Sequence, residues 1–276
     1  MSLLLAIAIV VVCTTVAVTL MLLVRRRAPE GSYFADGDRA AGVFGVLATG
    51  FSVLLGFVVF LAFTSYDAAR AGAEDEARLV AQQVETAQFL SAEHSVELTG
   101  ELVCYARSVA GVQWERMENH TLGDDLNPWS VELYRTLRTI DPQTAVEQAA
   151  YSKWLDQTSD REDARSARIH GARGVIPTPL WVVLFFAAVV IVAYMLLFAD
   201  SAERALVQGV MMGTVVALIV SMLLLLQFLN NPFHGGVGGL RPVAMERTLH
   251  ILDDELQAGG IQITPPCDER GDAREA

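Results

Sequence analysis

Four long apolar runs constrain this chain more than any other feature of its sequence. They cover residues 3–24, 41–65, 180–199 and 205–229, and none of them contains a charged side chain. A helix rises about 1.5 Å per residue, so about 20 apolar residues are needed to cross a hydrocarbon core. Each run meets that length. The sequence therefore predicts an all-α integral membrane protein with four transmembrane helices.

The composition agrees with this class of protein. Hydrophobic residues make up 53% of the 276 residues, and charged residues only 19%. The first run lacks a basic segment before it and is followed by Arg25, Arg26 and Arg27. It is therefore predicted to be a retained anchor rather than a cleaved signal peptide.

A polar stretch separates the second apolar run from the third. Residues 66–175 hold 19 acidic and 11 basic side chains, a net charge of −8. Apolar residues recur there at helical spacing, as in Val80, Val84 and Ala87. We predict an acidic helical soluble domain inserted between the second and third spans. The expected segments are 1–65 (two spans and a short basic loop), 66–175 (the domain), 176–229 (a transmembrane hairpin) and 230–276 (an acidic tail containing Gly and Pro).

Proline positions predict the helices of the polar parts. No proline occurs between residue 41 and Pro128, so the second span is expected to continue out of the bilayer as a long helix. Gly72, Gly100 and Gly111 are the expected points of bending or breaking. Further helices are predicted at 129–140, with Asn127 as N-cap, at 143–172 and at 242–257. Residues 230–241 should be irregular, and the end of the chain loose.

Charge does not decide which side of the membrane the domain occupies. With four spans, the two short loops share one side, and the domain and both termini share the other. Lys and Arg near spans favour the cytoplasm. Arg25, Arg26, Arg27 and Arg39 place the first loop there, whereas arginines that flank the second and third spans place the domain there. Cys104 and Cys267 could pair if the domain is external. The localisation is the cell membrane, with the side left open.

Several short motifs follow one another in a recognisable order. Residues 50–77 read GFSVLLGFVVFLAFTSYDAARAGAEDEA, and later segments include Gln113-Trp114-Glu115, Ile176-Pro177-Thr178-Pro179 and Asn231-Pro232-Phe233-His234-Gly235. Together they resemble the bestrophin-like family of mostly bacterial membrane proteins and, more distantly, bestrophin channels. The residues that carry this resemblance are Tyr66, Asp67, Glu76, Trp114, Arg165, Arg168, Asn231, Pro232, Phe233 and Gly235.

The resemblance implies a helical bundle whose second span lines a pore in a symmetric homo-oligomer, as in the pentameric anion channels of the bestrophin family. The three hydrophobic neck positions of bestrophins fall on Thr49, Val53 and Phe57. A spacing of four puts these residues on one helix face, where a ring of apolar side chains could gate by dewetting. The acidic run of the calcium-gated members is replaced here by residues 234–239, HGGVGG, which argues against a calcium clasp.

Two features have a structural alternative. Small residues of the second span, Gly45, Ala48, Thr49, Ser52 and Gly56, serve close helix packing as readily as a pore. Gly209 and Gly213 form a GxxxG pattern that favours helix contact. The group Arg161, Arg165, Arg168 and Arg173 suits anionic lipid contact or, equally, internal pairing with Glu162 and Asp163.

The sequence offers no motif for catalysis, a cofactor or a metal site. His94 and Glu97 lie one turn apart but lack a third ligand, and the acidic domain has no basic stripe for nucleic acid. Expected partners are the lipid bilayer, further copies of the chain and a protein partner of the 66–175 domain. We interpret the chain as a non-enzymatic membrane protein, an oligomeric ion channel lined by the second span. The alternative is a non-conducting scaffold or sensor that binds a partner through its acidic domain.

Overall fold

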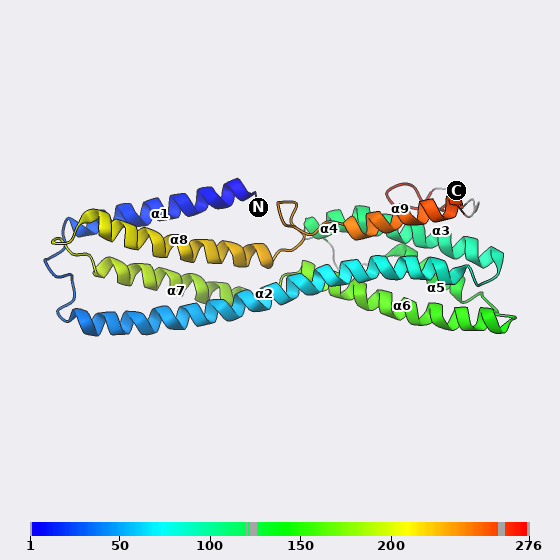
Figure 1. Cartoon of the computed structure of the whole chain (residues 1–276), viewed down its shortest axis with the longest axis horizontal. Coiled ribbons are helices and arrows are strands. Elements are labelled where there is room, and N and C mark those ends of the chain that lie inside the picture. Colours follow the sequence, from blue (N-terminus) through cyan, green and yellow to red (C-terminus); the bar gives the residue numbers. More distant parts are fainter. Residues whose placement is uncertain (1, 120, 122–125, 259–262, 275–276) are drawn as a thin grey trace. The chain divides into compact units, whose positions relative to one another are not determined.

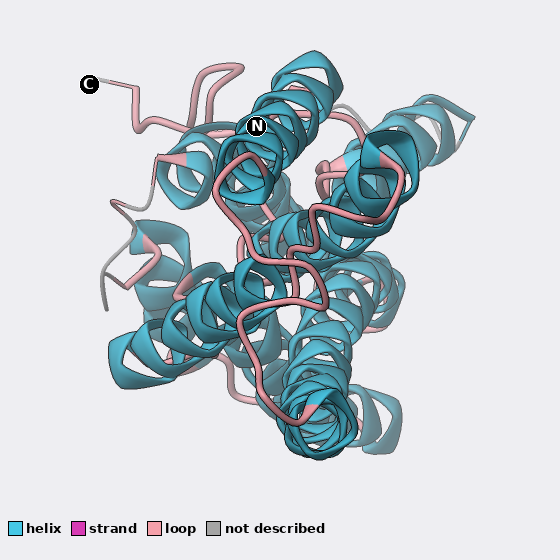
Figure 2. Cartoon of the chain, turned by 90° about the vertical axis from the view of Figure 1, so that its left-hand side faces the viewer, coloured by secondary structure: helices cyan, strands magenta, loops and turns pink. Residues whose placement is uncertain are grey.

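A computed structural model describes residues 2–119, 121, 126–258 and 263–274 of the chain (Figure 1). Helices and loops account for these residues, and Figure 2 shows no strand among them. The all-α prediction is confirmed. The helices are α1 (Leu3–Arg25), α2 (Gly37–Ala87), α3 (Ala92–Ser108), the π-helical segment η1 (Val109–Gln113), α4 (Trp114–Glu118), α5 (Pro128–Leu137), α6 (Ala145–Ala172), α7 (Thr178–Leu197), α8 (Ala205–Leu229) and α9 (Val243–Ala258).

The chain divides into two compact units. We call Met1–Ser65 with Gly174–Asn231 the membrane unit, and Tyr66–Arg173 with Pro232–Ala276 the helical unit. The second unit thus includes the tail residues, which the sequence alone placed in a separate segment. α2 is continuous from one set of residues into the other, as predicted from the absence of proline.

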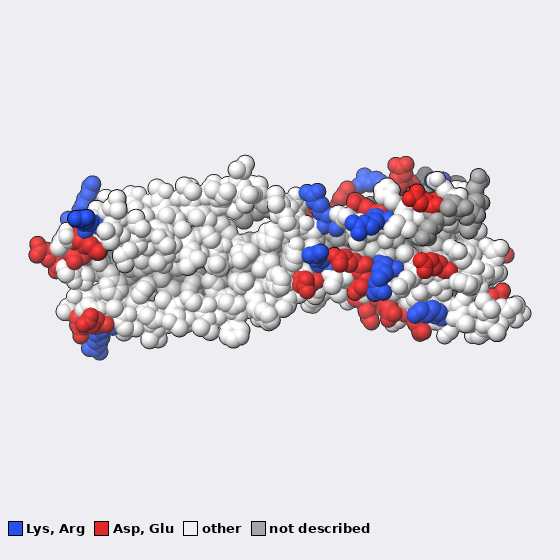
Figure 3. All heavy atoms as spheres, viewed as in Figure 1, with Lys and Arg blue, Asp and Glu red and all other residues white. Residues whose placement is uncertain are grey.

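The membrane unit holds α1, the first part of α2, α7 and α8. These four helices are long and apolar enough to cross a bilayer, as the four apolar runs predicted. In the view of Figure 3, charged side chains of this unit gather at the end that carries its two short links. Its sides expose large apolar residues such as Leu4 and Leu206. Such a surface is suited to lipid or to partner helices.

α1 packs against two glycines of α8. A Cβ added to Gly213 would lie 3.3 Å from Val18 and 3.4 Å from Thr14, and one added to Gly209 would lie 3.5 Å from Val18. Small residues let membrane helices approach closely. The prediction that this GxxxG pattern serves helix contact is confirmed.

The two short links of the membrane unit contact each other. Arg25 donates hydrogen bonds to the carbonyl oxygens of Ser201, at 3.0 Å, and Glu203. The backbone N–H of Gly31 donates to the carboxylate of Asp200 at 3.1 Å. The link between α1 and α2 and the link between α7 and α8 therefore lie at the same end of this unit.

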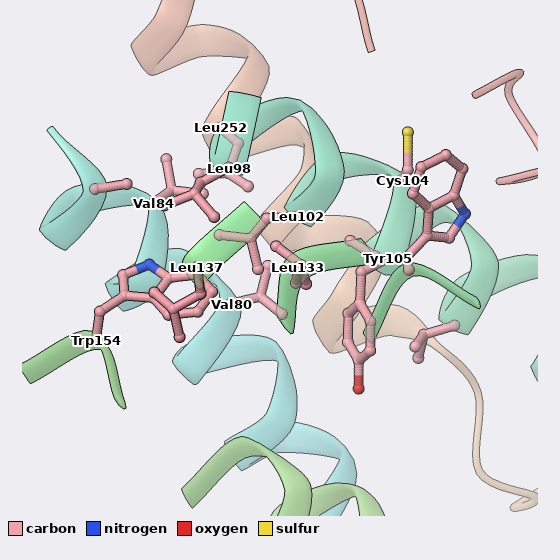
Figure 4. Close-up of a cluster of buried hydrophobic side chains, with 14 of the residues drawn as sticks. Val80, Val84, Leu98, Leu102, Cys104, Tyr105, Leu133, Leu137, Trp154 and Leu252 are labelled. Carbon is pink, nitrogen blue, oxygen red and sulfur yellow. The ribbon is translucent and has the colours of Figure 1, made fainter. Parts of the chain in front are cut away.

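The core of the helical unit is formed by helices far apart in the sequence. Figure 4 shows Val84 of α2, Leu98 and Leu102 of α3, Leu133 of α5 and Trp154 of α6 around one buried cluster. Trp154 is fully buried and its indole N–H donates to the carbonyl oxygen of Gln83 at 3.1 Å. The amphipathic pattern predicted from the sequence thus faces a shared core.

Two of the three glycines proposed as breaks, Gly72 and Gly100, do not interrupt their helices. α2 passes Gly72 without interruption and ends at Ala87, and Gly100 lies within α3. A Cβ on Gly72 would lie only 2.7 Å from the carbonyl oxygen of Ala164 and 2.8 Å from the backbone nitrogen of Arg168. Gly72 therefore permits close packing of α2 on α6 instead of breaking the helix. Gly111 lies in the π-helical segment η1, where the regular helix is indeed interrupted.

The last described residues are anchored, which corrects the prediction of a loose end. Cys267 forms a disulfide with Cys104 of α3. The indole N–H of Trp129 donates to the carbonyl oxygen of Gly271 at 2.6 Å, and Arg270 pairs with Glu115 at 3.1 Å. A covalent bond and a buried hydrogen bond therefore hold residues 263–274 to the helical unit. Sequence periodicity cannot detect such an anchor because the segment has no helical pattern.

A carboxyl group in the core of the helical unit gives this fold a pH-dependent stability. Glu101 of α3 is 7% exposed; one oxygen accepts a hydrogen bond from Thr136 at 2.9 Å, and the other has no partner. Burial raises the pKa of Glu101 to about 7. The unfolded value is about 4.3, so the favourable contribution of this group is complete below about pH 4 and is lost as the pH rises through about 7.

We expect Glu101→Gln to raise the free energy of unfolding at pH 8 by about 2 kcal/mol, because it removes a buried charge, and to change it little at pH 5. The measurement is the thermal midpoint of the detergent-solubilised protein at both pH values. Glu85→Gln, at an exposed position of α2, is the control. A difference between variant and wild type that is the same at pH 5 and pH 8 would contradict the assignment.

Candidate functional site

The pore face predicted from the sequence is uncovered in a single chain. Thr49, Val53 and Phe57 follow one another at intervals of four residues on α2, so they share one side of the helix. All three are exposed; Val53 and Phe57 retain 54% and 66% of their accessible surface. This face is therefore free to meet a solvent path, lipid or another copy of the chain.

Contacts within the membrane unit do not explain the glycines in the apolar part of α2. A Cβ added to Gly45, Gly50 or Gly56 would meet no atom within 4 Å. Packing inside the membrane unit, which accounts for the glycines of α8, does not require glycine at these positions. Their close-packing role, if they have one, involves another molecule.

An apolar cleft of about 390 Å³ opens beside this face within the membrane unit. Ala48, Ser52 and Gly56 of α2 line it together with Ile191 of α7 and Ile219 of α8. The small side chains thus share one wall of the cleft with larger residues of α2 such as Phe51 and Leu55, and the opposite side is apolar. Nothing in its lining is charged, so its chemistry suits hydrocarbon.

A buried ionic network occupies the helical unit. Glu76 of α2 and Arg168 of α6 are fully buried, and their side chains form a two-point ion pair with N–O distances of 2.5 and 3.0 Å. The hydroxyl of Tyr105 donates to Glu76 at 2.5 Å. Gly72, one turn before Glu76, allows α2 and α6 to come close enough for this pair.

Two further arginines of α6 belong to the same network. Arg161 donates to the side-chain oxygen of Gln83 at 2.8 Å, and Arg165 donates to that of Gln113 at 2.7 Å. Arg161 also lies over the ring of Tyr105, 4.5 Å from its centre. These amide oxygens carry no charge. The network therefore buries more guanidinium groups than carboxylates.

The burial of these arginines contradicts their proposed contact with lipid. Arg161, Arg165 and Arg168 are at most 7% exposed. Internal pairing is the correct alternative, but its main partner is Glu76 rather than Glu162, which lies 3.5 Å from Arg161 and 4.0 Å from Arg165. Burial disfavours the ionised phenol and raises the pKa of Tyr105, an effect that the nearby charge of Glu76 strengthens. Tyr105 therefore stays a hydrogen-bond donor to the carboxylate at physiological pH.

Aromatic motif residues complete this region. Trp114 and Phe233 make an edge-to-face contact with ring centres 5.2 Å apart. The indole N–H of Trp114 donates to the carbonyl oxygen of Leu240 at 3.3 Å, and the hydroxyl of Tyr66 donates to that of Gly238 at 2.8 Å. The segment after α8 is thereby held against α2 and α4. We call the set Glu76, Tyr105, Gln113, Trp114, Arg165, Arg168 and Phe233 the motif cluster.

The structure brings together only part of the predicted motif set. Glu76, Trp114, Arg165, Arg168 and Phe233 meet in the motif cluster, and Pro232 is buried beside Phe233. Tyr66 of α2 contacts the following loop through its hydrogen bond to Gly238. Asp67 is exposed, and Gly235 lies near Glu118. Asn231 belongs to the membrane unit, where its side chain donates to the carbonyl oxygen of Gln227.

Sequence analysis missed several residues on which this arrangement depends. Tyr105, which lies outside the motifs, donates to Glu76, and Gly72, which the sequence suggested as a helix break, lets α6 approach α2 closely enough for the Glu76 pair. Asn230 accepts hydrogen bonds from the backbone of Val175 and Ile176, at 2.9 and 3.0 Å, beside Gly174 with its positive φ. The spacing of Arg161, Arg165 and Arg168 did signal a common helix face, although it could not show that the face is buried.

The described residues contain no cluster of three or more histidine, cysteine or acidic side chains that would suit a metal ion. His94 instead shares a hydrogen bond with Ser91 at 2.7 Å. The site chemistry is therefore that of ion pairs, amides and aromatic rings.

Solved structures with this architecture include variants of a bacterial bestrophin homologue and a structure described only as a membrane protein. A point variant of a bacterial bestrophin homologue from Klebsiella pneumoniae superimposes with a TM-score of 0.66 at 13% identity, covering 88% of this chain and 98% of that one. A second variant of the same homologue gives 0.68 at 13% identity, with the same coverage. A structure described as a membrane protein gives 0.69 at 13% identity, covering 92% and 100%. At these identities the likeness shows a shared fold. Among curated proteins, none matches the sequence.

The fold thus defines a multi-pass helical membrane protein of the bestrophin type. The sequence itself matches the Bestrophin-like domain over residues 6–238. The chain belongs to the Bestrophin-like family, and the resemblance drawn from its motifs is confirmed. The match ends beside the segment held by Tyr66 and Trp114.

We expect Glu76→Gln to lower the free energy of unfolding by about 3 kcal/mol, and the thermal midpoint by about 10 °C, because it leaves Arg168 buried without its counter-charge. Thermal unfolding in detergent, followed by tryptophan fluorescence, measures this. Glu74→Gln is the matched control: its pair with Arg70 is exposed and should change stability by less than about 1 kcal/mol. Equal losses of unfolding free energy in the two variants would show that the buried pair stabilises the protein no more than the exposed pair does.

Proposed function

We propose that this protein is an ion channel of the bestrophin type, in which α2 helices of several copies surround a common axis. The observation that carries the proposal is the face of Thr49, Val53 and Phe57, which stays exposed among the described residues of the chain. Membership of the Bestrophin-like family and the shared fold support it.

Chemistry along α2 suits a hydrophobic constriction. From Ala41 to Ser65 the helix carries no charged side chain, and Val53 and Phe57 stand one turn apart on the exposed face. A ring of such side chains excludes water when narrow and conducts when widened or wetted. Thr49, one turn earlier, adds a hydroxyl that can contact a passing ion.

The small residues beside this face support assembly. Glycines that meet nothing within the chain allow another helix to approach, as small residues do in membrane interfaces. A closed ring of copies would repeat one head-to-tail interface between neighbouring chains. Self-association and conduction are therefore parts of the same proposal.

We expect Phe57→Ala to raise ion flux through reconstituted protein by about threefold or more, because it widens a dewetting constriction. Flux into liposomes with potassium and chloride gradients is the measurement, and oligomer size in mild detergent accompanies it. Phe186→Ala is the control, since Phe186 of α7 is similarly exposed, at 68%, but lies off the α2 face.

Equal effects of the two phenylalanine variants would contradict a pore along α2. A strictly monomeric protein would also exclude a central axis. A silent wild type that co-purifies with a stoichiometric partner of residues 66–175 would favour the non-conducting scaffold or sensor.

A further inference from the structure

An arginine-lined groove crosses one surface of the helical unit. It has a volume of about 700 Å³ and lies between α2 and the segment that leads into α9. Arg70 and Arg78 line it from α2, and Arg241 and Arg247 from the other side. Glu74 is the only acidic residue in its lining. An electropositive groove is notable in a chain with a net charge of −12.

The four arginines differ in whether a carboxylate already neutralises them. Arg70 pairs with Glu74 at 3.0 Å, and Arg78 with Asp75 at 2.9 Å. Arg241 and Arg247 are exposed and have no acidic partner among the described residues. Two guanidinium groups on one wall are therefore available to an external anion.

The remaining lining is amphipathic. The hydroxyls of Tyr66 and Thr248 already donate to the carbonyl oxygens of Gly238 and Ala77. Leu240, Val243 and Ala244 contribute apolar surface. Tyr66 directly follows the last residue of the apolar run of α2, and Arg78 lies 12 positions further on. At 1.5 Å per residue, this wall of the groove occupies about the first 20 Å of helix beyond that run. Tyr66 and Arg70, within about 8 Å of helix beyond the apolar run, stand at the depth of lipid headgroups.

We propose that this groove binds the phosphate group of an anionic ligand, with Arg241 and Arg247 as its main contacts. A guanidinium group offers two parallel N–H donors that match phosphate oxygens. The same chemistry is offered by a phospholipid headgroup and by free phosphate. For the group Arg161, Arg165, Arg168 and Arg173 the sequence left lipid contact and internal pairing open; the first three are buried, and this groove offers anion contact through other arginines.

The test uses the full-length protein in neutral detergent and two probes, short-chain phosphatidylglycerol and inorganic phosphate, with short-chain phosphatidylcholine as reference. We expect Arg241→Gln with Arg247→Gln to weaken phosphatidylglycerol binding by about tenfold. The double variant Arg135→Gln with Arg138→Gln is the control, because those exposed arginines lie outside the groove. Each variant's thermal midpoint without ligand reports its folding.

Binding of phosphatidylglycerol alone supports the proposal with a lipid headgroup as the source, and binding of both probes supports it with phosphate itself sufficient. Equal weakening in the two double variants overturns it. So does a wild type that binds phosphatidylglycerol no better than phosphatidylcholine.

A separate observation bears on the side of the membrane. Cys104 and Cys267 are 163 positions apart, fully buried, and joined by a disulfide. Disulfides persist in oxidising compartments and are rare in the cytosol, where thiols are kept reduced. The charge pattern of the sequence left the side open, so the disulfide adds the deciding information.

The basic loop agrees with this information. Arg25, Arg26, Arg27 and Arg39 lie in or next to the link between α1 and α2, and this region contacts the link between α7 and α8. Four spans place those links on the side opposite the helical unit. We infer that the helical unit lies outside the cytoplasm and that the two short links lie inside it.

Cysteine labelling of intact cells tests this inference. Lys153→Cys adds an exposed thiol to α6 of the helical unit, and Ala35→Cys adds one to the α1–α2 link. A membrane-impermeant maleimide should label the first in intact cells and the second only after permeabilisation. Acid trapping followed by a maleimide mass shift should find Cys104 and Cys267 oxidised in untreated cells. The reverse labelling pattern, or reduced cysteines, would overturn the inference.

Discussion

Burial of charge is the constraint on which the helical unit depends. A fully buried guanidinium group is tolerated only when its donors meet acceptors and its charge is offset. Arg168 meets both needs with Glu76. Arg165 and Arg161 donate to the uncharged amide oxygens of Gln113 and Gln83, and the Nε of Arg161 has no hydrogen-bond partner among the described residues. Glu162 offsets part of the charge of both, at 4.0 Å from Arg165 and 3.5 Å from Arg161. Glu76, Gln83 and Gln113 come from α2 or from the π-helical segment after α3. The network therefore fixes the position of α6 relative to both.

Glycine at position 72 is part of the same constraint. The backbone of α6 lies so close to α2 that any Cβ there would collide with Ala164 and Arg168. Without that approach, Glu76 would stand too far from Arg168 for a two-point pair. A residue that sequence analysis treats as a helix breaker is thus required because a helix passes beside it. The π-helical segment that contains Gly111 ends at Gln113 and is followed directly by Trp114, so it helps to position both residues in the motif cluster.

Local patterns made much of this fold predictable. Apolar length predicted the four long helices, Asn127 and Pro128 marked the start of α5, and the absence of proline predicted the continuation of α2. Burial of the α6 arginines could not be predicted in the same way. A helix face with Arg at 161, 165 and 168 looks the same whether it meets solvent, lipid or Glu76, because the partner lies 92 positions away. The pairing of Cys104 with Cys267 could be named from the sequence only on the condition of an external domain, since a disulfide leaves no periodic signal.

The charges of the chain bear on the kind of ion that a channel of this type would meet. Residues 66–173 and 232–276 carry the whole net charge of −12, and burial of some arginines does not change the long-range field of that total. An acidic domain raises the local concentration of cations and lowers that of anions. The exposed face of α2 adds no charge of its own, so a constriction there, as proposed for Val53 and Phe57, would act on hydration rather than on the sign of the ion. Any preference for anions would have to come from uncharged donors such as the hydroxyl of Thr49, working against the field of the domain.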